Sequence, residues 1–129
     1  MAYKRKLEKD ICCLLEYGME VFGGKWNSRI ICVLATLGTL RYSELRKEMG
    51  NITDAVLASA LKDLIANGII ERQSFDEIPP RVEYSLSERG KSVVSILQSI
   101  CQWAGLFYKT ETDPHMEQCQ KCDHRKGNA

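Results

Sequence analysis

Residues 69–90, IIERQSFDEIPPRVEYSLSERG, contain two short β-patterned runs joined by an acidic turn. Val82, Tyr84 and Leu86 alternate with polar residues, which is typical of a strand with one buried face. Pro79 and Pro80 fix the backbone φ angle and remove two hydrogen-bond donors, so the turn is stiff and cannot extend a sheet edge. Because two strands alone are marginally stable in water, we expect this hairpin to pack on helices.

The residues before the hairpin predict four helices. Apolar residues recur at helical spacing over residues 7–22, 26–37, 42–49 and 53–67. Ser43 and Thr53 are expected near helix N-caps, and Leu57, Leu61, Leu64 and Ile65 are expected to form the buried stripe of the fourth helix.

The third and fourth predicted helices are separated only by Gly50-Asn51-Ile52, a spacing typical of a helix-turn-helix. The hairpin follows directly, which gives the order helix, turn, helix, wing. We therefore predict a mainly α fold with a small β-hairpin, namely a winged helix-turn-helix. The alternative is a hairpin that only caps a helical core.

A long helix is predicted from Ser87 or Glu88 to about Tyr108, with a wide apolar stripe. A small winged helix does not need so much helix to close its core, so we predict N- and C-terminal dimerisation helices. The expected interface residues are Leu7, Ile11, Leu14, Val93, Leu97, Ile100, Ala104 and Phe107. The alternative is a monomer that folds this helix over its own bundle.

The length and composition predict one domain, over residues 1–110, and a polar, flexible tail over residues 111–129. No apolar run approaches the roughly 20 residues that span a bilayer, and the N-terminus lacks the features of a signal peptide, so we expect a cytoplasmic protein. The net charge is only +1, and acidic residues predominate over residues 48–88, which is a mild point against tight DNA binding. We do not expect an enzyme, since no nucleophile–base pair or paired carboxylates are visible and both histidines lie in the tail.

Several ordered motifs give the chain a family resemblance. They are Cys13 with Glu16, Gly23-Gly24-Lys25-Trp26, Arg41-Tyr42-Ser43-Glu44-Leu45, Ile52-Thr53, Leu57 with Leu61, Leu64, Asn67-Gly68-Ile69-Ile70-Glu71-Arg72, Pro79-Pro80-Arg81-Val82-Glu83-Tyr84-Ser85-Leu86, and Gly90. With these motifs the chain resembles the HxlR-type transcriptional regulators, a branch of the MarR-like winged-helix proteins. The resemblance covers residues 13–106 and implies a dimeric DNA-binding regulator.

In such a fold the fourth helix enters the major groove. Helical spacing places Asp54, Ala55, Ala58, Ser59 and Lys62 opposite the buried stripe, after Thr53. The hydroxyl groups of Thr53 and Ser59 can hydrogen-bond to base edges or phosphates. The alanine methyl groups can contact thymine methyl groups, and Lys62 can bind a phosphate. The Asp54 carboxylate could interact favourably with the helix dipole at the N-terminus, or it could accept a hydrogen bond from a cytosine amino group. Many family members carry longer polar or basic side chains here, so we expect weaker direct readout.

Further DNA contacts are expected outside this helix. Arg81 at the wing tip can reach a minor groove or phosphates, and the alternative is an ion pair within the wing to Asp76, Glu77 or Glu83. Arg41 and Ser43 are expected phosphate contacts, and Lys25 is a further candidate. Trp26 is expected in the core, between the first two helices.

Two groups of cysteines suggest chemistry beyond DNA binding. Cys13 matches a family cysteine that senses oxidants or electrophiles in some members, and the alternative is a buried structural thiol. Cys12 is not part of the family pattern. In the tail, His115, Cys119, Cys122 and His124 form a ligand set suited to Zn²⁺, although a tail without metal is the interpretation we favour, and no cofactor is required.

The sequence therefore predicts a homodimeric regulator that reads a pseudo-palindromic operator in double-stranded DNA through residues 53–67 and 69–86. A small-molecule or oxidant effector is a possible partner, and no membrane partner is expected. The alternative is a winged-helix module that binds other proteins and no specific DNA.

Overall fold

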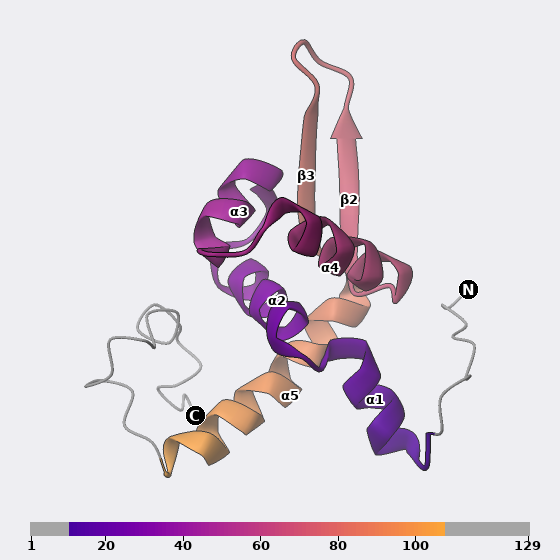
Figure 1. Cartoon of the computed structure of the whole chain (residues 1–129), viewed down its shortest axis with the longest axis vertical. Helices are drawn as coiled ribbons and strands as arrows, with labels where there is room; N and C mark the ends of the chain where they lie inside the picture. The colour runs from indigo at the N-terminus through magenta and orange to yellow at the C-terminus, as the bar shows by residue number, and fades with distance from the viewer. Residues whose placement is uncertain (1–10, 108–129) are drawn as a thin grey trace.

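The computed structural model describes residues 11–107, which form five helices and a small sheet (Figure 1). In chain order the elements are α1 (Leu14–Phe22), α2 (Lys25–Leu37), β1 (Leu40–Arg41), α3 (Tyr42–Met49), α4 (Asp54–Ala66), β2 (Ile70–Phe75), β3 (Arg81–Leu86) and α5 (Glu88–Gly105). The order confirms the predicted mainly α winged helix-turn-helix.

Helix α2 lies at the centre of the core. Its residues Ile30 and Ile31 are fully buried, and Val33 and Leu34 are nearly so. Leu45 of α3 and Leu57 of α4 are fully buried in the same apolar cluster. The helix-turn-helix therefore rests on α2, which fixes how α4 is presented to solvent.

The sheet has three antiparallel strands in the order β1-β3-β2. The pairing of Ile70 with Leu86 and of Phe75 with Arg81 sets the register of the wing, and Leu40 of β1 pairs with Tyr84. The two-residue strand β1 was not predicted, because it is too short to show an alternating pattern. It anchors the base of the wing, whose free end projects well beyond the helices (Figure 1).

Three helical details differ from the prediction. The first helix begins at Leu14, so Ile11 precedes it and Leu7 lies outside the described residues. Ser43 does not cap α3; Arg41 is the N-cap, and its backbone N–H donates to Glu44 Oε1 at 2.9 Å. Ile65 is partly exposed on α4, and Ala60 takes its expected place in the buried stripe.

The start of α5 is held against the end of α4 and the start of β2. Ser87 caps α5 by accepting from the Gly90 N–H at 2.9 Å, and its hydroxyl lies 2.6 Å from the carbonyl of Gly68 and 2.9 Å from that of Ile69. Gly90 is buried, and a β-carbon there would stand 2.1 Å from the carbonyl oxygen of Ile69. This close approach requires glycine.

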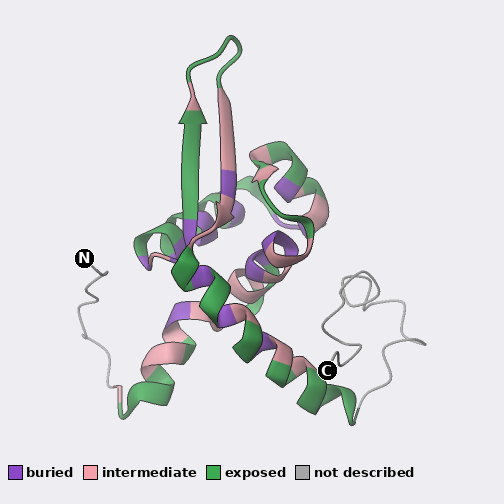
Figure 2. Ribbon diagram, turned by 180° about the vertical axis from the view of Figure 1, so that it is seen from behind, coloured by how far each residue is buried: buried purple, intermediate pink, exposed green. Residues whose placement is uncertain are grey.

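Helices α1 and α5 leave the body of the molecule in different directions, and their outer ends are exposed (Figures 1 and 2). Gly105 ends α5, a little before the predicted boundary near Tyr108, which lies outside the described residues. None of the described helices is long and apolar enough to cross a bilayer.

Candidate nucleic-acid interface

The turn between α3 and α4 fixes the direction of α4. Gly50 ends α3 with a positive φ of 79°, a conformation that glycine adopts without steric cost. Ile52 is buried in the core, and the Arg46 guanidinium reaches its carbonyl oxygen at 3.5 Å. Thr53 then caps α4, as predicted, by accepting from the Val56 N–H at 3.2 Å.

The outward face of α4 is exposed as the helical spacing predicted. Asp54, Ala55, Ala58, Ser59 and Lys62 are all exposed. Four of these five side chains are short, so the backbone of α4 can approach a groove closely. Among these described residues, the outward face of α4 therefore carries short side chains, with Asp54 at its start and the longer Lys62 further along.

Asp54 has partners within the protein. Its carboxylate lies 2.6 Å from Arg46 Nε, and it accepts from the Tyr42 hydroxyl at 3.2 Å. Burial raises the pKa of Tyr42, and the hydrogen bond and negative charge of Asp54 raise it further, since both favour the neutral phenol. Asp54 thus ties α3 to α4, in addition to lying at the helix N-terminus where the dipole favours a carboxylate.

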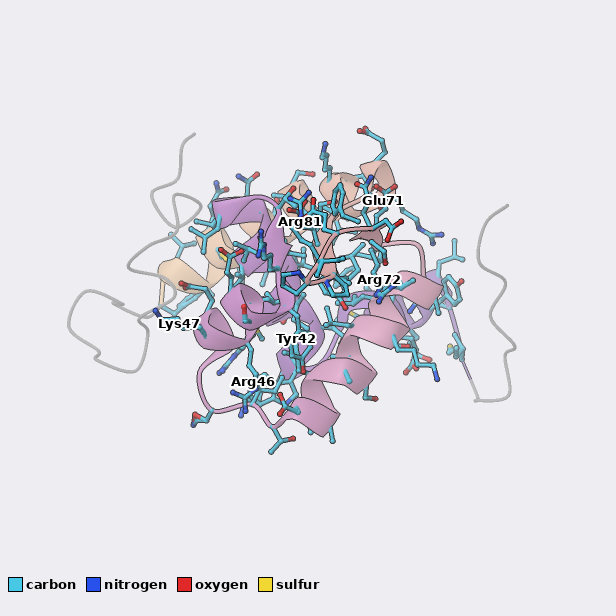
Figure 3. All side chains as sticks on the ribbon, turned by 90° about the horizontal axis from the view of Figure 1, so that it is seen from above. Tyr42, Arg46, Lys47, Glu71, Arg72 and Arg81 are labelled. Carbon is cyan, nitrogen blue, oxygen red and sulfur yellow. The ribbon has the colours of Figure 1, made fainter. Side chains whose placement is uncertain are left out.

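Lys62 and Arg72 line one groove between α4 and the base of the wing. The groove has a volume of about 270 Å³, and its other lining residues are Tyr42, Ala58, Leu61, Ile65 and Tyr84. Arg72 is on β2 and pairs across the sheet with Tyr84, so both belong to the sheet face that turns toward α4. In Figure 3, Arg72 lies beside the ribbon of α4. Sequence reasoning missed Arg72, although strand alternation puts it on the same face as buried Tyr84.

Arg81 is held inside the wing. Its two terminal nitrogens each lie 2.9 Å from a carboxylate, one of Glu77 and one of Glu83, and its guanidinium stacks over the Phe75 ring at 3.8 Å. Only 25% of its side chain is exposed. The ion-pair alternative is therefore present in the free chain, and the predicted DNA contact by Arg81 would have to compete with it.

The remaining predicted DNA contacts surround α3 and α4. Arg41 and Ser43 are exposed at the start of α3. Lys25 is exposed at the start of α2, with its Nζ 4.6 Å from the centre of the Trp26 ring. Trp26 is partly buried against the core and also lines a shallow groove along α4 with Ala55, Ser59 and Lys62. The structure therefore brings Lys25 and Trp26 to the side of the candidate interface.

The predicted interface residues on α1 and α5 fall into two groups. Val93 and Leu97 are buried in the chain's own core, so they leave little surface for a second chain to contact. Leu14, Ile100, Ala104 and Phe107 are exposed, and Ile11 is half-buried. The exposed Trp103 and Leu106 were missed because they flank the expected stripe; the Trp103 and Phe107 rings lie 5.3 Å apart.

No disulfide joins the cysteines that the structure describes. Cys13 is exposed at the N-cap of α1, beside exposed Cys12, which is against the buried-thiol alternative. His115, Cys119, Cys122 and His124 lie outside the described residues, as does the whole predicted tail.

A sequence profile of HxlR-like helix-turn-helix proteins matches residues 21–112. The chain belongs to this family. A protein of Methanothermobacter thermautotrophicus, described as an uncharacterized HTH-type transcriptional regulator, is 39% identical over 100 residues, which are 78% of this chain and 76% of that protein. The expected family is thus confirmed.

Solved structures of transcriptional regulators, some described as members of the MarR family, have the same fold. The crystal structure of ytcD, described as an HTH-type transcriptional regulator, superimposes with a TM-score of 0.70 at 41% identity and covers 74% of this chain and 96% of that one. The oxidized form of the redox regulator HypR superimposes with a TM-score of 0.66 at 33% identity and covers 75% and 98%. This HxlR-like chain is a transcriptional regulator with a helix-turn-helix and not an enzyme.

Proposed function

We propose that this HxlR-like regulator binds double-stranded DNA through α4 and the wing. The observation that carries the proposal is the convergence of Lys62 and Arg72 on the groove beside the low outer face of α4. With α4 in a major groove, Ala55, Ala58 and Ser59 would face base edges, and Lys62 and Arg72 would meet phosphates.

The flanking contacts follow from the same placement. Arg41 and Ser43 at the start of α3, the Thr53 hydroxyl and Lys25 at the start of α2 are proposed phosphate contacts. Asp54 is not proposed to read a base, because it already binds Arg46 and Tyr42. With so few long side chains on α4, we expect much of the specificity to come from DNA shape and backbone contacts.

We further propose that the functional unit is a homodimer built from α1 and α5. Leu14 is 87% exposed, and Trp103, Leu106 and Phe107 are each at least 65% exposed. Large exposed apolar side chains on the outer ends of two protruding helices are typical of an interaction surface. A twofold dimer that reads a pseudo-palindromic operator needs its two copies of α4 about 34 Å apart.

Cys13 is proposed as an oxidant-sensing thiol of this dimer. The support is its exposure at the start of α1 and the likeness to the redox regulator HypR. Its oxidation would alter the end of a helix in the proposed dimer surface and so the spacing of the two wings. Loss of DNA binding under oxidant is expected for the parent and not for Cys13→Ser; equal loss in both would refute the sensor role.

The DNA-binding proposal is tested by the salt dependence of binding to duplex DNA, measured by fluorescence anisotropy with Lys62→Ala and a matched control, Lys91→Ala. Lys91 is exposed in the first turn of α5, and the groove that it lines is formed by residues of α2, the sheet and α5, with none from α4. We expect Lys62→Ala to weaken binding and to lower the salt slope by roughly 0.9, and Lys91→Ala to match the parent. Equal effects of the two substitutions would refute the placement of α4. Binding that does not depend on salt would favour the alternative, a module that binds proteins.

A further inference from the structure

We propose that Cys12, Cys13 and Glu16 form a binding site for a thiolate-seeking divalent cation of the Zn²⁺ class. One ligand atom from each of these side chains, the two sulfurs and a carboxylate oxygen, lies within 4.8 Å of the other two. Both thiols are free and exposed, at the entrance to α1. The proposal goes beyond DNA binding and does not depend on it.

The local backbone brings the three ligands together. Cys13 is the N-cap of α1 in an extended conformation, with φ −157° and ψ 173°, so the chain turns sharply into the helix. Glu16 lies one turn further along, and its Oε1 accepts from the backbone N–H of Cys12 at 2.8 Å. This hydrogen bond pulls the carboxylate back over the helix start, toward the two sulfurs. A ligating carboxylate that is oriented by such a hydrogen bond is typical of built metal sites.

The spacing is close to that of a metal-bound state. Sulfur atoms around a tetrahedral zinc with Zn–S distances of about 2.3 Å stand roughly 3.8 Å apart. The ligand atoms therefore need to close in by roughly 1 Å, a shift that rotation of the exposed side chains can supply.

The donor set selects the kind of cation. Two sulfurs and one carboxylate suit Zn²⁺ or the softer Cd²⁺, whereas Mg²⁺ and Ca²⁺ require shells of oxygen ligands. Three protein ligands leave one tetrahedral position for water. Cys12 completes the sulfur pair, which gives a role to the residue that departs from the family pattern.

The test is a titration of the full, reduced chain with Co²⁺ as a spectroscopic probe, followed by displacement with Zn²⁺. The background carries Cys119→Ser and Cys122→Ser, so that the tail cysteines do not contribute. We expect one Co²⁺ per chain, with thiolate-to-cobalt charge transfer and the visible bands of tetrahedral cobalt. Cys12→Ser and Cys13→Ser should abolish the charge-transfer signal, and Glu16→Gln should weaken Zn²⁺ binding by roughly tenfold or more.

Two matched controls complete the design. Cys101→Ser removes a thiol from α5, and Glu20→Gln neutralises a carboxylate one turn further along α1; both should bind as the background does. Circular dichroism would show that each variant keeps its helices. Absence of Co²⁺ and Zn²⁺ binding by the background, binding that survives Cys12→Ser, or one metal per two chains would each overturn the proposal.

Discussion

At the scale of single residues, the charged side chains around the wing and α4 mostly hold other side chains. Arg81 binds Glu77 in the wing turn and Glu83 on its own strand, and it covers Phe75 on the opposite strand. Asp54 joins α3 to α4 through Arg46 and Tyr42. Each contact lowers the charge that is free to meet DNA. The side chains on α4 that remain available to contact DNA are short, such as Ser59, or lie at the edge of the groove, such as Lys62.

Arg81 is expected to stabilise the wing. We predict that Arg81→Ala lowers the free energy of unfolding by about 1–2 kcal/mol, because it removes two partly shielded ion pairs and a cation–π contact. Arg81→Lys should lose most of this stability, since an ammonium group cannot bridge two carboxylates as a planar guanidinium does. The measurement is urea-induced unfolding of both variants beside the parent.

Arg72→Ala is the control for this prediction, because Arg72 donates a single exposed hydrogen bond to Ser74 at 3.2 Å in the same hairpin. Its unfolding free energy should stay within about 0.5 kcal/mol of the parent. If Arg81→Lys kept the full stability and only weakened DNA binding, Arg81 would be a DNA contact and the bracing role would be wrong.

The residue scale also shows what sequence can predict about the site. The exposure of Ala55, Ala58, Ser59 and Lys62 follows from helical spacing, which is a local property. The partners of Asp54 and Arg81 depend on the geometry of a turn and of a hairpin. Helical spacing therefore does not predict which side chains come into contact there. The sequence spacing could identify Glu77 and Glu83 as possible ion-pair partners of Arg81. It could not show whether Arg81 binds these carboxylates or contacts DNA.

At the scale of elements, the junction of α4, β2 and α5 sets the angle of the wing. The Ile69 carbonyl lies within hydrogen-bonding distance of the Ser87 backbone N–H, at 3.0 Å, and of its hydroxyl, at 2.9 Å, and α5 passes over this carbonyl at Gly90. Because the wing begins at Ile70, any shift of α5 at this point would be passed to the wing.

Gly90→Ala should therefore destabilise the fold. The added methyl group would stand 2.1 Å from a backbone oxygen, which cannot move without breaking the Ser87 contacts. We predict a loss of about 3 kcal/mol in the free energy of unfolding, measured by thermal or urea denaturation. Gly105→Ala, at the end of the same helix with no atom within 4 Å of the new methyl, should be neutral or slightly stabilising. Equal stabilities of the two variants would contradict the tight junction.

The sequence predicted the elements whose signals are strong and local. The bounds of α3 and α4 follow from Gly50, the Thr53 cap and the apolar spacing, and the wing strands follow from alternation around Pro79-Pro80. Strand β1 could not be predicted, because two residues become a strand only when β3 is beside them. The start of α1 was placed too early, since Ile11 continues the helical spacing before the actual N-cap at Cys13.

At the scale of the whole molecule, the exposed apolar ends of α1 and α5 are the clearest sign of a partner. Figure 2 shows that the outer parts of both helices are exposed, in contrast to the buried residues at the centre. The sequence predicted this surface in outline, but it assigned Val93 and Leu97 to it. The spacing of apolar residues is the same along the whole of a long helix. It therefore cannot show which turns pack on the chain's own core and which turns project beyond the core.

The proposed dimer predicts that Trp103→Glu gives a monomer with a folded winged helix. Trp103 is 65% exposed, so a charge there should leave the core intact and oppose burial between two chains. Analytical ultracentrifugation would measure the change in mass. Ile78→Glu is the control, since Ile78 is fully exposed in the wing turn, far from α5, and its substitution should leave the dimer unchanged. A parent that sediments as a monomer would contradict the proposed assembly.

The central claim, a twofold dimer that reads DNA with α4 and the wing, is tested most directly by selection of binding sites from a random duplex library with the full, reduced chain. The account predicts enrichment of an inverted repeat whose half-site centres are about 10 base pairs apart, with one dimer bound per site and binding that weakens as salt rises. Enrichment of no sequence, or of isolated half-sites bound by single chains, would contradict it.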